Sequence, residues 1–336
     1  MNAPKISVII PLYNAENFIR QCLISVLASK FADYEVLVVD DCSTDSSVAE
    51  VEKLLPHFGG RLKILSTEKN SGGPGVPRNI GVKNSAGKYV TFIDNDDMIL
   101  PTSLENFFEL AENFQADAVH AVHAFSFDDA DGKNFSRDDL KLRKDLSEDF
   151  VQFAGLDAEN FSRRMKDYVV GKFLWMPWGK FFRRDFLLAN RIDFPQIKFS
   201  EDFVFCFKCL CLAKNYLRVP LATNIHRIRR GSVSKKVTTS REGVRNWLGV
   251  VTSVVSILGD FVDGLEFFRA NPEIRRDVLK FFIDAHFYMI RNLFTTVQPH
   301  EVPKIFFDEL QNPALNQRGK DIIAAHLFAE KFSRRL

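Results

Sequence analysis

Short apolar runs alternate with helix-like segments over the first 125 residues, and this alternation restricts the fold more than any other feature of the chain. Runs rich in β-branched residues predict buried strands at 6–12, 34–39, 62–65, 88–93 and 118–124. Apolar residues at helical spacing predict helices between them, at 16–29, 44–55, 76–84 and 101–114. The pattern therefore predicts an α/β fold with a Rossmann-type, mostly parallel sheet sandwiched by helices.

The rest of the chain divides into three parts by composition. Residues 126–150 are polar and mixed in charge, which indicates a loop or an insertion, and residues 150–235 are rich in aromatic side chains. From 236 to 336 the spacing is helical, with helices expected at 244–262, 274–294, 302–310 and 319–332. We therefore expect one α/β domain over 1–235, with halves at 1–125 and 150–235, and a C-terminal α-helical extension.

Charge and cysteine content restrict the setting of the protein. Lys and Arg number 45 and Asp and Glu 43, and the net charge of +2 argues against a strongly basic nucleic-acid binder. The five cysteines are odd in number and lack framework spacing, which indicates a reducing, cytoplasmic setting. The apolar run 247–262 is interrupted by polar residues and is too short to span a bilayer, so at most we expect peripheral contact with the inner face of the cell membrane.

Acidic residues follow two of the predicted strands. The second strand runs into VDDCSTD, where Asp41 either accepts a hydrogen bond from a nucleotide base or belongs to a helix cap. The fourth runs into FIDNDDM, whose three carboxylates would repel one another without a nearby cation. Such a cluster suits Mg²⁺ or Mn²⁺, and a solvated acidic turn is the alternative. Because ligands bind beyond the carboxyl ends of parallel strands, we expect both clusters to line one crevice.

A glycine-rich segment, NSGGPGVPRNIG, lies between the two acidic clusters. Its glycines let the backbone approach a ligand, and Arg78 stands where a helix begins, which suits an anionic group. The alternative is a plain glycine-rich loop with a surface arginine. The segment is neither a P-loop nor a dinucleotide fingerprint, because no Gly-Lys-Ser/Thr follows and it does not directly follow the first strand.

In this order and spacing, the motifs resemble glycosyltransferase family 2, whose members have the GT-A fold. The matching segments are SVIIPLYNAENFI, VDDCSTD, PRNIG, GKYVTFIDNDD, WGKFFRRDF, SED and HRIRRGSVS. The resemblance implies a GT-A-like catalytic domain over 1–235, with a nucleotide-binding half at 1–125 and an acceptor-binding half at 150–235. Two positions depart from it. Cys42 replaces the usual Gly, which is compatible with a turn that needs no positive φ, and Pro77 stands where Ala is common.

The resemblance also implies residue roles. Asp202, the second acid of Ser-Glu-Asp, would be the catalytic base, and Asp96 with Asp94 would bind Mn²⁺ or Mg²⁺. His226 would be either a further metal or phosphate contact or an ordinary core or surface histidine. The residues implied on the donor side are Pro11, Tyr13, Asn14, Asp41, Arg78, Asp94, Asn95, Arg227 and Arg229. Those implied on the acceptor side are Trp178, Lys180 and Glu201.

The implied activity is a metal-dependent, inverting transfer of a sugar from a nucleotide-diphosphate sugar to an acceptor hydroxyl, with UDP as the typical nucleotide. The acceptor would be a glycan, a glycolipid or a protein, in bacterial surface polysaccharide or glycoconjugate synthesis. Metal and arginines would stabilise the leaving diphosphate while the base takes the acceptor proton. Two other functions stay open: a catalytically silent sugar-nucleotide-binding module, and a sugar nucleotidyltransferase. The second is disfavoured because its glycine-rich loop would directly follow the first strand.

Several further features have two interpretations. The cysteines in FVFCFKCLCLAK are either core residues of a helix or, less in keeping with their spacing, zinc ligands. The aromatic residues of FLWMPWGKFF either stack on a sugar or pack in the core. The basic window 214–245 is either a solvated face or a diphosphate site that continues into an anionic surface. The Phe-rich C-terminal helices contact a membrane, pack as a subdomain, or form a homodimer interface.

Overall fold

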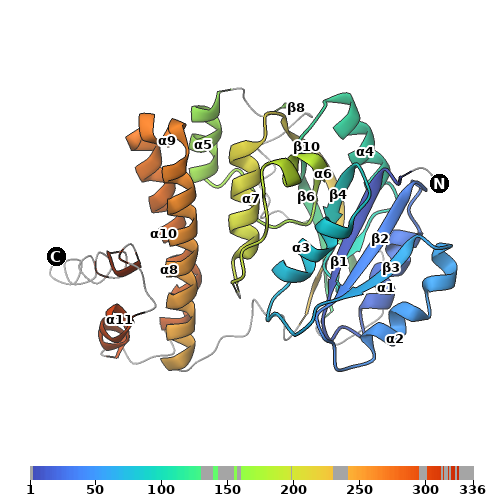
Figure 1. The fold of residues 1–336 in the computed structure, drawn as a ribbon, viewed down its shortest axis with the longest axis horizontal. Coiled ribbons are helices and arrows are strands. Elements are labelled where there is room, and N and C mark those ends of the chain that lie inside the picture. The colour runs from blue at the N-terminus through green and yellow to red at the C-terminus, as the bar shows by residue number, and fades with distance from the viewer. Residues whose placement is uncertain are drawn as a thin grey trace. The chain divides into compact units, whose positions relative to one another are not determined.

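The computed structural model describes residues 3–129, 139–142, 155–156, 160–197, 199–229, 241–294 and 301–311, with 313, 317, 319–321 and 324. The chain divides into two compact units. Unit 1 is Met1–Phe161 with Lys172–Arg230, and unit 2 is Ser162–Gly171 with Gly231–Leu336. Unit 1 has the predicted α/β fold, and the described elements of unit 2 are helices (Figure 1).

The parallel strands of unit 1 bring their carboxyl ends to one edge of the sheet. β1 (Ile6–Leu12) lies between β2 (Tyr34–Asp40) and β4 (Tyr89–Phe92) and is parallel to both, while β3 (Leu62–Ser66) continues the sheet parallel to β2. All seven residues of β1 are buried, as expected for a strand covered on both faces. The turns that follow β1, β2 and β4 therefore lie next to one another.

An antiparallel strand joins this group to a second parallel pair. β9 (Lys180–Arg183) pairs antiparallel with both β4 and β6 (Ala118–Asp128), and β6 is parallel to β10 (Tyr216–Ile228). The order is β3-β2-β1-β4-β9-β6-β10-β5, with β5 (Met98–Ile99) antiparallel to β10. Two short strands attach to this path, namely β7 (Lys141–Leu142) on β6 and β8 (Gly155–Leu156) on β10. The mostly parallel sheet is confirmed, with β9 as an internal exception.

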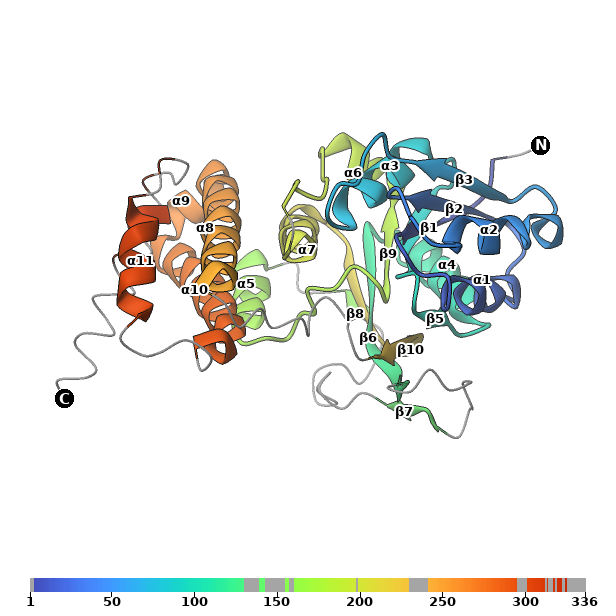
Figure 2. The ribbon, with the colours of Figure 1, turned by 90° about the horizontal axis from the view of Figure 1, so that it is seen from below.

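Helices cover both faces of the sheet (Figure 2). The main core lies on one face, where Val8 and Ile10 pack with residues of α1 (Ile19–Leu27), α2 (Ser47–Glu52) and α4 (Ser103–Asn113). The other face carries α3 (Gly75–Asn84), α6 (Arg184–Ala189) and α7 (Glu201–Leu212). Ile9 points to that face, against Gly81 of α3. The alternation along β1 thus divides its side chains between the two layers.

Element ends differ from the sequence-based expectations for local reasons. The helix expected over 44–55 ends at Glu52 and is followed by a 3₁₀ turn, Leu55–Phe58. Pro56 explains this end, because it has no N–H to donate to the carbonyl of Glu52. β6 continues to Asp128, beyond the expected strand end at 124, because β10 pairs with it along that length. Most of the helix expected over 319–332 lies outside the described residues.

Unit 2 is built from α5 (Phe161–Val169), α8 (Arg241–Gly264), α9 (Glu266–Ala270), α10 (Pro272–Phe294) and α11 (Val302–Leu310). Its core includes Val251 and Leu258 of α8 and Phe282 of α10, all fully buried. Tyr168 of α5 packs edge-on against Phe281, with ring centroids 5.0 Å apart. The short α5 therefore packs in the same unit as helices that begin more than seventy residues later in the sequence.

One helix in the described part of the chain is long and apolar enough to cross a membrane. It is Asn246–Gly264 within α8, 19 residues with a mean hydropathy of 1.4. The expectation that this run is too short to span a bilayer is therefore wrong, because the helix continues beyond 247–262. Half of the window is buried inside the structure, and a core helix of a soluble protein passes the same test.

Replacing Gly81 should test the contact between α3 and β1. A Cβ at this position would lie 2.4 Å from Ile9 Cγ2, so we expect Gly81→Ala to lower the free energy of unfolding by about 1–3 kcal/mol. Denaturant unfolding measures this loss. In the Ile9→Ala background the same change should cost clearly less, because the colliding methyl group is gone, and additive losses would contradict the packing argument.

Stability should depend on pH through the buried His120. Burial lowers its pKa well below the usual value, and nearby Lys180 and Arg218 lower it further. Below pH 6.5 the unfolded chain therefore takes up a proton at His120 that the folded chain does not, so the contribution of this residue to stability falls as pH falls, by about 1.4 kcal/mol between pH 7.5 and 5.5. His120→Gln should reduce this pH dependence in denaturant titrations. Replacing the exposed His57 by Gln is the control and should leave the dependence unchanged.

Candidate active site

The turns after β1 and β2 are tied together by Asn14. Its Oδ1 accepts a hydrogen bond from the N–H of Thr44 at 2.8 Å, and its own N–H donates to Ser43 Oγ at 3.1 Å. Asn14 has a φ of 44°, a conformation that Asn tolerates better than most residues. The neighbouring Tyr13 is 47% exposed. The predicted donor-side residues of these turns therefore lie together at the end of the parallel strands.

Asp41 is buried at the end of β2 and bonded to the segment before α3. Its carboxylate accepts hydrogen bonds from Thr67 Oγ1, Ser71 N and Ser71 Oγ, each at 2.9 Å. Its carbonyl oxygen accepts a fourth bond from Asn70 Nδ2 at 2.9 Å. Asp41 thus fixes the start of the glycine-rich segment, a task that the sequence pattern did not indicate. The Ser71 N–H is shared with the second carboxylate oxygen at 3.0 Å, so a further donor to Asp41 would take over that shared position.

Cys42 departs from expectation. Its φ is 61°, so the turn after Asp41 does need the left-handed region that favours glycine. From the sequence, we expect Cys in place of Gly to be tolerated if the turn needs no positive φ. The turn does need it, so Cys42 carries backbone strain. The thiol lies 3.7 Å from the carbonyl of Thr67 and 3.6 Å from its hydroxyl, weak contacts that only partly offset the backbone strain.

The acidic loop after β4 is held from both sides. Asn95 donates from Nδ2 to the carbonyl of Pro11 at 3.0 Å, which fastens the loop to β1. Asp96 accepts a hydrogen bond from Arg229 Nε at 2.7 Å. Asp97 is fully buried, its carboxylate lies 3.2 Å from His226 Nδ1, and burial raises its pKa to about 6 although the histidine lowers it. Asp97 belongs to the same motif, but the sequence pattern predicted no function for it.

Arg227 is a buried connector beside this loop. Its backbone N–H donates to Asp97 Oδ1 and its Nε to the carbonyl of Asp96, both at 2.9 Å. The terminal nitrogens bond Asp129 and Gln21. The guanidinium also lies over Phe127 and Phe18, 4.8 and 5.1 Å from the ring centroids. Only 3% of the residue is exposed, so its observed contacts are those of a loop anchor.

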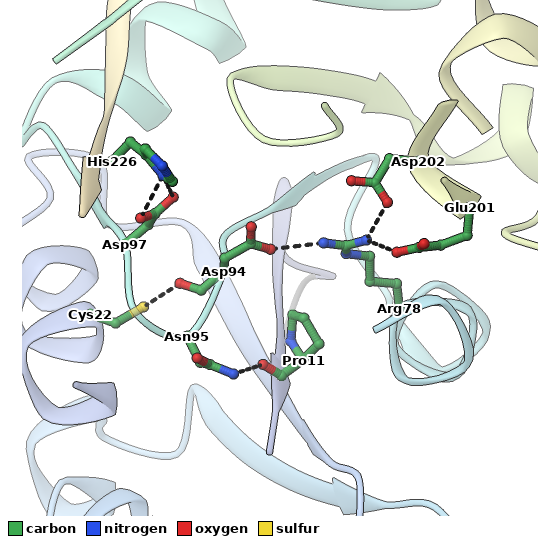
Figure 3. A network of polar contacts seen from close by, with 9 residues as sticks. All are labelled: Pro11, Cys22, Arg78, Asp94, Asn95, Asp97, Glu201, Asp202 and His226. Carbon is green, nitrogen blue, oxygen red and sulfur yellow. Dashed lines mark hydrogen bonds and ion pairs between the residues drawn. The ribbon is translucent and has the colours of Figure 1, made fainter. Parts of the chain in front are cut away.

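Arg78 joins the acidic loop to α7. Its NH2 donates to Asp94 Oδ1 at 2.8 Å, and its NH1 lies 3.3 Å from Glu201 Oε1 and 3.3 Å from Asp202 Oδ1. In Figure 3 the guanidinium lies between Asp94 on one side and the two acids of α7 on the other. Residues 78, 94 and 202, which come from three distant motifs, thus converge on one point.

The predicted acceptor-side residues lie close to this network. Trp178 is mostly buried and stacks on His226, with centroids 5.7 Å apart and ring planes 11° from parallel. Phe181 and Phe182 are fully buried, so these two aromatic residues are core. Lys180 is also buried, its Nζ donates to the carbonyl of Met176, and burial lowers its pKa. Trp178 and His226 therefore form a stacked aromatic pair next to Asp97 of the acidic loop.

Burial controls protonation at the start of α7. It raises the pKa of Glu201 well above the usual value, and the hydrogen-bonded carboxyl of Asp202 raises it further. The environment therefore favours the protonated form of the Glu201 carboxyl. Ser200, which precedes it, has a φ of 64°, a strained conformation for a residue other than glycine.

The residues present fit a metal only as a partial ligand set. Among the described residues no group of three or more His, Cys, Asp or Glu side chains is arranged to hold an ion. Asp94 and Asp96 remain, and Mg²⁺ is commonly bound through one or two carboxylates, with phosphate oxygens and water completing the shell. His226 directs Nδ1 to Asp97. The pair Asp94 and Asp96 thus suits a cation that binds together with a diphosphate.

The cysteines and the basic window resolve in part. Cys206 and Cys209 are buried in α7, none of the five cysteines forms a disulfide, and burial raises the pKa of Cys206 to about 12, which agrees with the core interpretation. Arg218 is buried with its guanidinium 4.4 Å from the Phe173 ring centroid, so it belongs to no solvated face. Residues 230–240 of the window lie outside the described residues.

With this geometry established, comparison with known proteins defines the class. The model of glycosyl transferase family 2 matches residues 7–188, and the chain belongs to this family. Residues 1–349 of Staphylococcus aureus TarS, solved with UDP-GlcNAc, share the fold at a TM-score of 0.69 and 25% identity, over 95% of this chain and 83% of that one. The GT-A-like α/β fold is thereby confirmed.

Two relatives delimit what the family assignment covers. Glycosyltransferase GlyA of Streptococcus pneumoniae is 30% identical over 233 residues, 69% of this chain but 32% of GlyA. A glycosyltransferase of Haemophilus influenzae is 30% identical over 266 residues, 76% of this chain and 94% of that protein. The chain thus spans about a third of the larger relative and nearly all of the smaller one.

The strain at Cys42 can be measured by substitution. Cys42→Gly should leave stability unchanged or raise it by up to about 1 kcal/mol, because glycine adopts positive φ without a Cβ clash but loses more chain entropy. Cys42→Val should lower it by about 1–3 kcal/mol, because a β-branched residue tolerates this region worst. Thermal or denaturant unfolding compares them. Cys42→Ala is the control that removes the thiol alone, and equal stabilities for Gly, Ala and Val would disprove the strain.

Proposed function

We propose that this protein is a metal-dependent, inverting glycosyltransferase that moves a sugar from a nucleotide-diphosphate sugar, with UDP as the preferred nucleotide, to an acceptor hydroxyl. One observation carries the proposal: Asp94 of the acidic loop and Asp202 of α7 contact the same guanidinium, at 2.8 and 3.3 Å. In this proposal Asp94 faces the donor diphosphate and Asp202 takes a proton from the acceptor. The two carboxylates are held close together because one guanidinium bonds both.

Asp202 is the proposed base. Its side chain is 19% exposed, so it is open to an acceptor, while Glu201 beside it is nearly sealed. Burial favours the protonated form of Glu201, and a protonated carboxyl cannot take a further proton, so the more exposed Asp202 is assigned as the base. It would take the hydroxyl proton as the acceptor oxygen attacks the anomeric carbon from the face opposite the leaving group, which inverts the configuration.

The donor side is proposed to use the turns after β1, β2 and β4. Tyr13 is exposed beside the buried Asp41, which suits a flat base stacking on the ring and donating to the carboxylate. Arg229 is 26% exposed and contacts Asp96, so its positive charge is available to the leaving diphosphate beside that residue. Asp94 and Asp96 would hold Mg²⁺ or Mn²⁺, which when bound neutralises the diphosphate as it leaves. The TarS complex with UDP-GlcNAc supports a UDP-sugar donor.

Acceptor and setting are proposed from the same features. His226, whose side chain is 33% exposed, is backed by the mostly buried Trp178, and its ring is of the kind that sugars pack against, which suits a glycan or glycolipid acceptor. Relatives that carry names such as poly(ribitol-phosphate) β-N-acetylglucosaminyltransferase support surface polysaccharide synthesis. Five cysteines that form no disulfide support a cytoplasmic location.

A donor screen with a base variant tests the proposal. Thermal shift with Mn²⁺ across UDP-, GDP- and TDP-sugars should identify a stabilising nucleotide, and wild-type protein should transfer its sugar. Asp202→Asn should lower kcat by about 10²- to 10⁴-fold, the usual contribution of a general base, with little change in the Kd for UDP. Isothermal titration and product chromatography give the two values.

Asp193→Asn is the matched control, since it removes a carboxylate that is 70% exposed and lies outside the network. Full transfer by Asp202→Asn would refute the base assignment. Donor binding without any turnover by wild-type protein would instead indicate a silent binding module. Release of pyrophosphate from a nucleoside triphosphate and a sugar phosphate would indicate a nucleotidyltransferase.

A further inference from the structure

The side chain of Arg78 is nearly sealed within unit 1. Its exposed fraction is 2%, and both terminal nitrogens are bonded to carboxylates, NH1 to Glu201 and Asp202 and NH2 to Asp94. The planar fork of a guanidinium presents these nitrogens in a fixed geometry, which a lysine cannot reproduce. The positions of three carboxylates on two separate segments are thus set by one rigid group.

The helix that carries Arg78 is shaped for this contact. Gly75 lies one turn before Arg78 on the same face of α3, and a Cβ there would be 3.1 Å from both Glu201 Cγ and Phe194 Cβ. The missing side chain is what lets the start of α7 reach the guanidinium. The glycine is therefore a packing requirement of the Arg78 network.

Asn79, the residue after Arg78, fixes Phe194 beside the guanidinium. Asn79 exchanges two hydrogen bonds with the backbone of Phe194, from Nδ2 to the carbonyl at 2.8 Å and from the N–H to Oδ1 at 2.9 Å. This places the Phe194 ring 5.2 Å from the Arg78 guanidinium. A cation enclosed by a ring, a helix and three acids has little freedom to turn toward a ligand.

The exposure of the acids points the same way. Asp94 is 33% exposed and Asp202 19%, whereas the arginine between them is 2% exposed. The two acids thus keep accessible surface, whereas the guanidinium bonded to both of them has almost none. A ligand therefore meets the acids before it meets the arginine.

We infer that Arg78 is a positioning residue: its guanidinium fixes Asp202 relative to Asp94, and with it the base relative to the donor, and does not itself bind the diphosphate. This rests on the proposed function and replaces the diphosphate contact that the family resemblance implies for Arg78. Loss of the Arg78 guanidinium would leave the nucleotide site intact but would let Asp202 move relative to the anomeric carbon of the donor.

Separate measurements of binding and turnover test the inference on full-length protein. In Arg78→Lys we expect the Kd for UDP with Mn²⁺ and the KM for the donor to stay within about threefold, and kcat to fall about a hundredfold, the loss typical of a reacting group displaced by an ångström. Arg218→Lys is the control for shortening a buried arginine, and its kcat and Kd should match the wild type. Circular dichroism verifies that each variant is folded.

A tenfold or greater rise in the Kd for UDP in folded Arg78→Lys would overturn the inference, because it would make Arg78 a diphosphate ligand. An unchanged kcat would overturn it as well. If Arg78→Lys does not fold, Gly75→Ala serves, because its Cβ would press on Glu201 and Phe194 and leave the guanidinium in place. It should lower kcat about tenfold with unchanged UDP binding, and an unchanged kcat would count against positioning. Wild-type protein that binds UDP but transfers nothing would refute the proposed function, while the Kd of Arg78→Lys would still decide whether Arg78 contacts the nucleotide.

Discussion

Removing the Arg78 guanidinium from water is the constraint on which the site depends. A buried cation is tolerated only where negative groups replace its lost hydration, and here Asp94, Glu201 and Asp202 supply them. These acids come from the loop after β4 and from the start of α7, more than a hundred residues apart. The electrostatic requirement of one side chain therefore determines where α7 begins relative to the parallel strands, and Gly75 provides the space for that approach.

The acidic loop follows the same rule with the charges exchanged, because here carboxylates are paired with cations. Asp96, Asp97 and Asp129 lie in or near this loop. They are contacted by His226 and Arg227 of β10 and by Arg229 just after it. The net charge of +2 thus conceals strongly charged groups that are matched in pairs. Pairing with arginine also orients Asp94 and Asp96 before any ligand arrives, which lowers the reorganisation that binding requires.

Sequence patterning predicted what depends on local periodicity. The apolar runs predicted the parallel strands, and parallel direction alone places Asp41 and the Asp94–Asp97 turn at one edge. It did not predict β9, whose antiparallel pairing joins residues 180–183 to strands about ninety and sixty positions away. The partners of Arg227 were also missed, because Gln21 and Asp129 come from a helix and from a segment interpreted as a loop. Pairings across such distances leave no periodic trace in the chain.

Backbone strain separates the site from the rest of the scaffold. Among the described residues, five that are not glycine have positive φ: Asn14, Cys42, Gln115, Arg191 and Ser200. Gln115 and Arg191 follow the ends of α4 and α6, where the left-handed conformation commonly terminates a helix. The other three stand after β1, after β2 and before α7, on the three segments that carry Tyr13, Asp41 and Asp202. Each is held by neighbouring bonds or by the charge network, so the fold maintains local strain where it must aim side chains into one space. A site built in this way has its geometry set by the surrounding packing, which is why its turns tolerate residues that the local sequence alone would disfavour.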